Sequence, residues 1–232
     1  MKNLSHLPIP EFNQFPNPYL RTMKLRWKIA QFFEAWWWRR YLKGKPLPEY
    51  LAWKRQYWFD FLKKIDVAVP PKASILDAGC GPAGIFLVFP ENPVTAVDPL
   101  LAQYRPLFTH FTDGSLRNIR FVEQPMEQFV APQQYDLVFC LNAINHVADL
   151  DLCLQRLREA TRPGGSLVLS VDAHNHPFFK RVFQWVPGDI LHPHQLDLSD
   201  YQQRLLAHGF EVKRALMLKQ EFFFGYWVLL AS

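Results

Sequence analysis

The segment from Ile75 to Gly84, with the sequence ILDAGCGPAG, constrains the fold more than any other part of the chain. Its first residues are apolar and typical of a short buried strand, and its glycines permit a tight turn and a close approach of a ligand to the backbone. Gly79, Gly81 and Gly84 fit the spacing G-x-G-x-x-G. A strand that runs into such a turn predicts a parallel α/β sheet with a nucleotide site at this point.

The carboxylate of Asp77, at the end of the same strand, distinguishes between two kinds of nucleotide cofactor. The pyrophosphate of a dinucleotide would meet Asp77 as a like charge, whereas an ammonium group would meet it as an opposite charge. Capping of the turn is the structural alternative for this residue. We therefore expect a cofactor that carries a positive group at this end.

From residue 74 onward, the sequence alternates between strand and helix patterns. Strands are expected at 74–78, 93–97, 119–122, 135–141 and 165–172, and helices at 83–88, 99–109, 125–129, 149–162, 177–184 and 199–208. Two further strands, at about 210–218 and 222–231, follow without a helix between them. This pattern predicts a doubly wound, Rossmann-like α/β fold with a seven-stranded, mostly parallel sheet and an antiparallel last strand.

Residues 1–70 are predicted to form a proline-rich arm and a helical cap ahead of a main domain at 71–232. Four prolines lie within the first 18 residues, and apolar residues then recur at three- and four-residue steps over about 20–43. A second helix, ended by Pro70 and Pro71, is expected from a further apolar stripe made of Tyr50, Trp53, Tyr57, Phe61 and Ile65.

The net charge of +5 is unevenly placed, because residues 1–72 carry +9 and the remainder carries −4. The acidic remainder argues against a nucleic-acid footprint over the main domain. The Trp36–Arg40 cluster suits peripheral contact with a membrane surface, and a solvated basic face or helix packing is the alternative. Three successive tryptophans point around a helix, so they cannot all face one core.

The cysteines Cys80, Cys140 and Cys153 form no Cys-x-x-Cys pair, which favours reduced, mostly buried thiols. No signal-peptide pattern or 18-residue apolar stretch is present in the sequence. We expect a cytoplasmic protein, with a peripheral position at the membrane surface as the further option.

Four segments in order resemble the class I methyltransferases that use S-adenosylmethionine (SAM), in particular the small-molecule branch with quinone-biosynthesis and sterol methyltransferases. They are 75–81 as the first motif, Ala96–Pro99 after the second strand, 135–147 around the fourth strand and 162–170 leading into the fifth. The resemblance implies SAM as cofactor, S-adenosylhomocysteine as product, and methyl transfer to a small, apolar or aromatic acceptor.

By this resemblance, Asp98 would accept hydrogen bonds from the ribose hydroxyls, with a helix cap as its structural alternative. Pro125 stands where many relatives carry the acid that binds adenine, so the adenine amine would lack that acceptor unless Glu123 or Gln124 replaces it. The implied cofactor-binding residues are Asp77, Gly79, Cys80, Gly81, Asp98, Pro99, Met126 and Asn142.

His146 is the candidate catalytic residue, because an imidazole beside the transferred methyl could take a proton from the acceptor. A packing role for His146 is the alternative. No helical H-x-x-x-H spacing accompanies the later histidines and Pro193 interrupts them, so no metal site is predicted. The expected acceptor-binding residues are Trp37, Tyr41, His174, His192 and His194.

Two other function classes remain open at this stage. One is a binding or scaffold protein that retains the fold and docks through its basic aromatic helices. The other is an NAD-dependent oxidoreductase that uses the three glycines, against which Asp77 and the final strand pair both argue.

Overall fold

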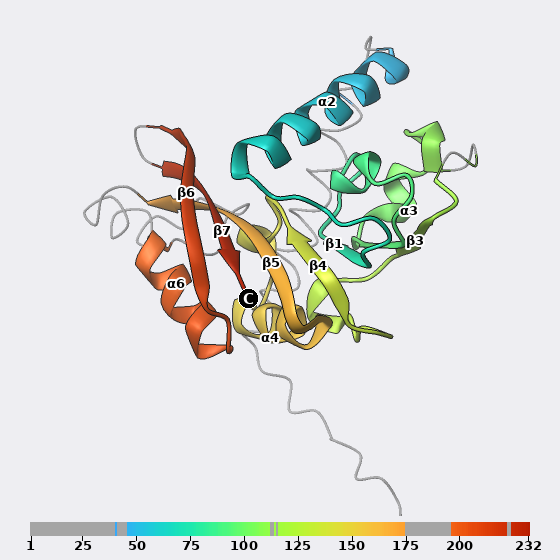
Figure 1. The fold of residues 1–232 in the computed structure, drawn as a ribbon. Helices are drawn as coiled ribbons and strands as arrows, with labels where there is room; N and C mark the ends of the chain where they lie inside the picture. Colours follow the sequence, from blue (N-terminus) through green and yellow to red (C-terminus); the bar gives the residue numbers. More distant parts are fainter. Residues whose placement is uncertain (1–39, 41–45, 112–113, 115, 175–195, 222–223) are drawn as a thin grey trace, which may run out of the picture.

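Seven strands form a single sheet in the computed structural model, which describes residues 40, 46–111, 114, 116–174, 196–221 and 224–232. Their order across the sheet is β3-β2-β1-β4-β5-β7-β6 (Figure 1). They are β1 (Ile75–Ala78), β2 (Val94–Val97), β3 (Ile119–Val122), β4 (Tyr135–Cys140), β5 (Thr161–His174), β6 (Val212–Gln220) and β7 (Phe224–Ala231). β7 runs antiparallel to both its neighbours and the other pairs are parallel. The predicted fold is confirmed.

The chain changes direction across the sheet at β1. It moves outward from β1 through β2 to β3, then returns to place β4 on the other side of β1. Asp77 consequently lies in register with Ala96 of β2 and with Phe139 of β4. In open α/β sheets, ligands bind beyond the carboxyl ends of the strands at such a reversal. This topology places the glycine turn at the expected ligand-binding edge.

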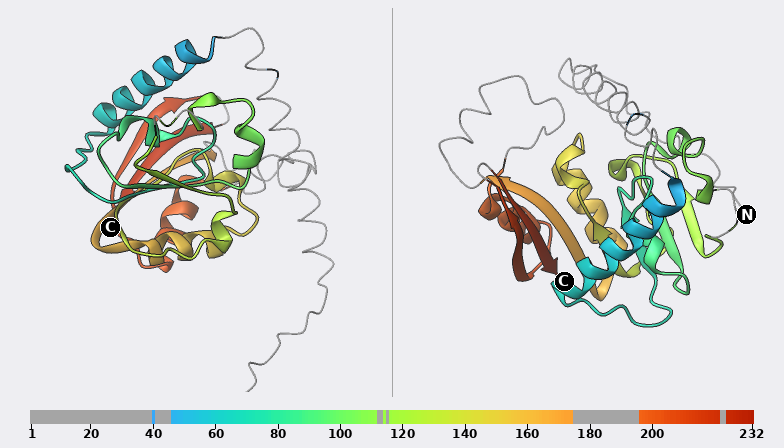
Figure 2. Two further views of the ribbon diagram at one scale, coloured as in Figure 1. Left: turned by 90° about the vertical axis from the view of Figure 1, so that its right-hand side faces the viewer. Right: turned by 90° about the horizontal axis from the view of Figure 1, so that it is seen from above.

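The helices cover both faces of the sheet (Figures 1 and 2). α2 (Leu47–Ile65) packs on one face together with the 3₁₀ turn η1 (Ile85–Val88), while α4 (Leu150–Ala160) and α6 (Leu198–Ala207) pack on the other. Asp149 caps α4, and Asp197 with Asp200 forms a capping box on α6. Each face therefore buries its own apolar cluster.

Several expected helices are shorter than the sequence indicated. The segments at 83–88 and 125–129 form only the 3₁₀ turns η1 and η3 (Met126–Gln128). The segment at 99–109 contains α3 (Leu101–Tyr104), and the 3₁₀ turn η2 (Thr109–Phe111) follows it. Pro106 has no amide hydrogen to continue α3, which explains why this helix stops after one turn.

α2 buries a face different from the predicted stripe. Trp53 was expected inside but is 54% exposed, whereas Trp58 is 4% exposed and its indole Nε1 donates a hydrogen bond to the carbonyl of Ala83 at 3.0 Å. The buried face is centred on Trp58, Phe61 and Ile65, so Trp53 falls at its edge. The helix ends at Asp66 in the left-handed conformation, before the prolines.

The expected arm, the helix at 20–43 and the helix at 177–184 lie outside the described residues. The domain boundary at residue 70 stays a prediction. α2 nevertheless shares one apolar cluster with β1, η1 and β4, so this helix is part of the core on its side of the sheet.

Replacing Trp58 with alanine should destabilise the protein by about 3–5 kcal/mol, because it removes a buried aromatic ring and a hydrogen bond. Trp53→Ala is the matched control on the same helix and should cost less than about 1 kcal/mol. Urea unfolding followed by circular dichroism measures both. Equal destabilisation by the two variants would contradict the packing of α2 described above.

Candidate functional site

The turn after β1 is held by the end of β2. Gly79 and Gly81 adopt φ values of 71° and 58°, which side chains other than glycine rarely adopt. The amides of Gly79 and Cys80 both donate to the carbonyl of Val97, at 2.8 and 3.1 Å. The turn is therefore fixed by the sheet before any ligand binds.

The three glycines of the turn serve different purposes. A Cβ on Gly79 would lie 2.2 Å from the Cβ of Ala143, and a Cβ on Gly84 would lie 2.5 Å from Oδ2 of Asp77. A Cβ on Gly81 would meet no atom of the described residues within 4 Å. Two glycines therefore permit tight packing within the protein, whereas the backbone at Gly81 is open to a ligand.

Asp77 is a buried carboxylate, 2% exposed, whose Oδ2 accepts a hydrogen bond from the amide of Phe86 at 3.1 Å. Burial raises the pKa of Asp77 to about 7, and the negative charge of Asp98 adds to the rise while the hydrogen bond opposes it. Within the described part of the chain, no lysine or arginine forms an ion pair with Asp77. The carboxylate is thus placed where a cationic ligand group would relieve its desolvation.

Asp98 follows β2 and connects the glycine turn after β1 to the segment that leads into α3. Its Oδ2 accepts from the amide of Gly81 at 2.9 Å, and its Oδ1 accepts from the amide of Leu100 at 2.8 Å. The second bond spans only two residues and is not a helix cap, because the N-cap of α3 is Leu100 and has no side-chain hydrogen bond. A carboxylate has about four lone-pair sites, so it can accept from ligand hydroxyls as well as from these amides. The ribose role therefore remains a prediction.

Cys80 and Pro99 flank these carboxylates. Cys80 is buried, and burial raises the pKa of its thiol well above the ordinary value, with Asp98 and Asp77 adding to the rise. The thiol consequently stays protonated. Cys140 and Cys153 are also buried, as expected, and the reduced state of the thiols stays a prediction.

The turn after β4 lies directly against the glycine turn, as the contact between Gly79 and Ala143 requires. Asn142 is exposed and has a φ of 54°. Its amide donates to Oγ of Ser170 at 2.8 Å, and this hydroxyl lies 3.3 Å from Oδ1 of Asn142. β5 therefore fixes the predicted cofactor-binding asparagine beside the turn.

His146 is exposed at the end of the 3₁₀ turn η4 (Ile144–His146). Its neighbour Asn145 is buried and accepts a hydrogen bond from the hydroxyl of Tyr201 at 2.9 Å. The structure thus presents the His146 ring at the surface of a well-anchored segment.

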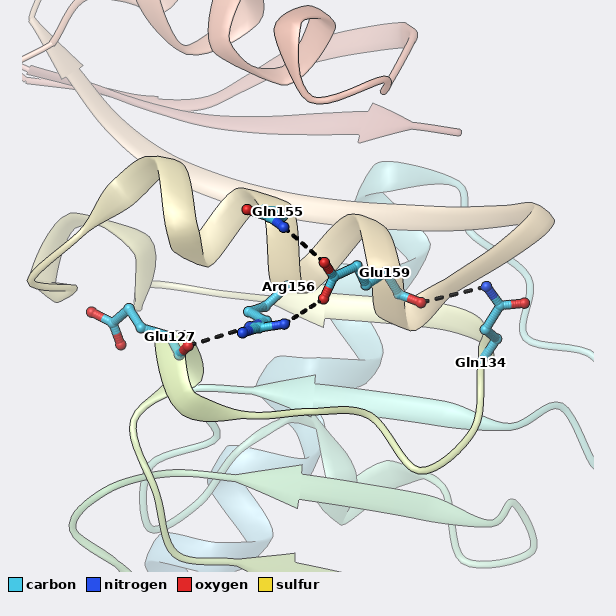
Figure 3. Close-up of polar contacts among 5 residues, drawn as sticks. All are labelled: Glu127, Gln134, Gln155, Arg156 and Glu159. Atoms are coloured by element: carbon cyan, nitrogen blue, oxygen red, sulfur yellow. Dashed lines mark hydrogen bonds and ion pairs between the residues drawn. The ribbon is translucent and has the colours of Figure 1, made fainter. Parts of the chain in front are cut away.

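Glu127 provides a second anchor that the sequence did not reveal. Its carboxylate accepts from the amides of Ala148 and Asp149 at 2.7 and 3.2 Å. Its carbonyl accepts from Nε of Arg156 at 3.4 Å, and Arg156 is itself paired with Glu159 (Figure 3). These contacts connect η3, the His146 segment and α4. No local motif could have predicted them, since each partner is more than 20 residues from Glu127.

Met126 is buried in the apolar cluster that also contains Val97, at the ends of neighbouring strands. Pro125 directly precedes it in an extended conformation. The expected packing of Met126 against an adenine ring stays a prediction.

His174 is the one expected acceptor-binding residue inside the described part of the chain. It is buried at the end of β5, with its ring centroid 4.5 Å from that of Phe224. Trp37, Tyr41, His192 and His194 lie outside the described residues, as does the Trp36–Arg39 part of the basic cluster. Among the described side chains, no group of three or more His, Cys, Asp or Glu is arranged to hold a metal ion.

Comparison with known proteins identifies the family. A model of the methyltransferase domain matches residues 50–215, which is more than half of the chain. The chain belongs to this methyltransferase-domain family. The assignment confirms the resemblance to class I SAM-dependent methyltransferases and agrees with SAM as the cofactor.

Individual relatives of this methyltransferase-domain protein are distant. It is 27% identical over 154 residues to the ubiquinone biosynthesis O-methyltransferase of Saccharophagus degradans, covering 64% of this chain and 62% of that protein. The chain spans less than two thirds of the length of the curated relatives that it matches first.

Solved structures support the fold. The 1,6-didemethyltoxoflavin-N1-methyltransferase of Burkholderia thailandensis, crystallised with 1,6-didemethyltoxoflavin and S-adenosylhomocysteine, aligns with a TM-score of 0.58 at 18% identity, covering 97% of this chain and 92% of that one. The [4+2]-cyclase SpnF aligns with a TM-score of 0.60 at 13% identity, covering 76% and 79%. The same fold thus occurs in proteins described by different reactions.

The described helices include none with the length and hydropathy needed to cross a bilayer. Peripheral contact through the N-terminal helices stays a prediction.

Asp77→Asn should flatten the pH dependence of stability. Because the folded carboxyl binds its proton more tightly than the unfolded one, the Asp77 contribution to the free energy of unfolding falls as pH rises from 3.8 to about 7. The wild type should lose up to about 4 kcal/mol more than the variant over this range. Urea unfolding of both proteins at several pH values measures the difference, and parallel curves would contradict the burial of Asp77.

Proposed function

We propose that this protein transfers a methyl group from SAM to a small, apolar or aromatic acceptor. The observation that carries the proposal is the pair of buried carboxylates, Asp77 and Asp98, beside an open glycine turn. A pyrophosphate would add negative charge to a site that already holds two carboxylates. An ammonium group and two ribose hydroxyls fit the same site.

The residues of the turn fit SAM in three respects. Asp77 would receive the ammonium of the methionine part, because this buried carboxylate has no cationic partner among the described residues. Asp98 would accept hydrogen bonds from the ribose hydroxyls through its remaining lone pairs. Gly81 leaves space for the nucleoside to approach the backbone.

When bound, SAM supplies a methyl group that is already activated for transfer. The chain's own contribution would be to position the acceptor in line with that methyl group and to exclude water. Asn142 would border the reacting end of the cofactor, since its turn packs on Gly79. His146 would take a proton from an acceptor that must lose one, or otherwise line the site.

An aromatic acceptor is supported by the 27% identity to an enzyme described as a ubiquinone biosynthesis O-methyltransferase. The aromatic face of α2 also favours it, since aromatic side chains desolvate a flat ring well. The proposed acceptor contacts of Trp37, Tyr41, His192 and His194 extend this proposal to residues beyond the described part.

A non-catalytic binding protein is the second candidate. The observation that favours it is Pro125, which stands where many relatives carry the acid that binds adenine, because loss of that acceptor would weaken cofactor binding. Only a direct measurement of product formation separates the two candidates.

Asp98→Ala should lower the affinity for S-adenosylhomocysteine by about 10- to 100-fold, because hydrogen bonds to a charged group contribute about 1.5–3 kcal/mol. Asp60→Ala, which removes an exposed carboxylate on α2, is the control and should leave the affinity unchanged. Isothermal titration calorimetry measures both. Failure of the wild type to bind either SAM or S-adenosylhomocysteine would exclude the proposed function.

A further inference from the structure

Polar side chains gather on the α2 side of the sheet, next to the turn after β4. Ser170 and Asp172 alternate along β5, and Asp172 is in register with Tyr226 of β7. Alternate residues share a face of a sheet. Tyr226 and Tyr57 of α2 both pack against the apolar cluster on this face. We call these residues together the Tyr226 group, which consists of Tyr57, Asn142, Ser170, Asp172 and Tyr226.

The Tyr226 group lies close to the predicted cofactor site. Asn142 is hydrogen-bonded to Ser170, and the adjacent Ala143 is in contact with Gly79 of the glycine turn. The polar contacts thus lead from the glycine turn to the middle of the sheet face under α2. An acceptor placed there would be adjacent to the bound nucleoside.

The hydroxyl of Tyr226 is buried and makes no well-formed hydrogen bond within the described residues, although Tyr57, Ser170 and Asn142 lie close enough to influence its pKa. Ser170 and Asn142 are near enough to affect it, but they satisfy each other, since Oγ of Ser170 both accepts from the Asn142 amide and pairs with its side chain. A buried hydroxyl without a partner costs stability, and such groups in native proteins usually have a functional explanation.

The chemistry of this hydroxyl points to a donor role. Burial raises the pKa of Tyr226 above its ordinary value, and although Ser170 opposes this rise, Tyr57 and Asp172 add to it. The phenol therefore keeps its proton. A protonated phenol can donate a hydrogen bond to an oxygen atom of a ligand.

The side chains around Tyr226 favour an uncharged, hydroxylated aromatic ring. The group contains two phenols, a hydroxyl, an amide and the carboxylate of Asp172, whose charge would repel an anion. Nζ of Lys54 lies 4.8 Å from the centroid of the Tyr57 ring, and burial lowers the pKa of this lysine to about 8, which weakens its attraction for an anion. The ring of Tyr57 packs edge-on against Trp58 with centroids 4.9 Å apart, so aromatic surface borders the group. A flat ring could pack on this surface while its oxygen meets Tyr226.

We propose that Tyr226 binds the methyl acceptor by donating a hydrogen bond to one of its oxygen atoms, and that the acceptor is a hydroxylated aromatic compound. The inference rests on the proposed function, and it assigns acceptor binding to β7, which the sequence analysis did not consider.

Tyr226→Phe tests this role, because it removes the hydroxyl and keeps the ring. Catechol is the probe, benzene is its deoxygenated counterpart, and binding to protein saturated with S-adenosylhomocysteine is measured by NMR titration. The variant should bind catechol at least about tenfold more weakly, with unchanged affinity for S-adenosylhomocysteine and for benzene. Its Tm should equal or exceed that of the wild type.

Tyr135→Phe is the matched control, since it removes another buried phenol hydroxyl without a partner, on the opposite face of the sheet. This variant should leave the affinities for catechol and for S-adenosylhomocysteine unchanged. Equal catechol binding by wild type and Tyr226→Phe, or no catechol binding by the loaded wild type, would overturn the inference while leaving the proposed function intact. Absence of S-adenosylhomocysteine binding by the wild type would instead overturn the proposed function and the inference with it.

Discussion

The burial of two carboxylates at neighbouring strand ends is the constraint on which the site depends. Asp77 and Asp98 repel one another, and each accepts hydrogen bonds from backbone amides. Desolvation makes this arrangement costly in the absence of a ligand. A cationic nucleoside would offset the cost, which explains why a destabilising pair can be retained at the edge of an otherwise apolar sheet.

The glycines are needed for reasons that differ along the turn. Only Gly79 and Gly81 require the left-handed conformation, whereas Gly84 is needed because the carboxylate of Asp77 occupies the space where a side chain would lie. The turn after β4 imposes a similar restriction, because the side chain of Ala143 fills the space where a side chain on Gly79 would lie. Small residues thus bring the predicted nucleoside site and the Asn142 turn into contact.

The two faces of the sheet differ in their polar residues. α4 and α6 form a packed layer, and the anchors made by Glu127 and Tyr201 fix the segment that carries His146. The opposite face, beneath α2, combines apolar packing around Trp58 with the polar residues near Tyr226. The proposed acceptor site would therefore lie on the side covered by α2, while both faces contribute buried apolar clusters to stability.

Local patterns were sufficient to predict the strands and the position of Asp77, Gly79 and Gly81 at the end of the first strand, because alternation and glycine spacing depend on neighbouring residues. They also indicated Asp98, which follows directly from the end of the next strand. The prediction of the buried face of α2 was partly wrong, because several aromatic residues of this helix could face the core. Only packing against the sheet buries Trp58 and leaves Trp53 exposed. The contacts of Glu127, the pairing of Asn145 with Tyr201 and the unpartnered hydroxyl of Tyr226 were decided by tertiary structure alone, since each joins residues from separate elements that no sequence period connects.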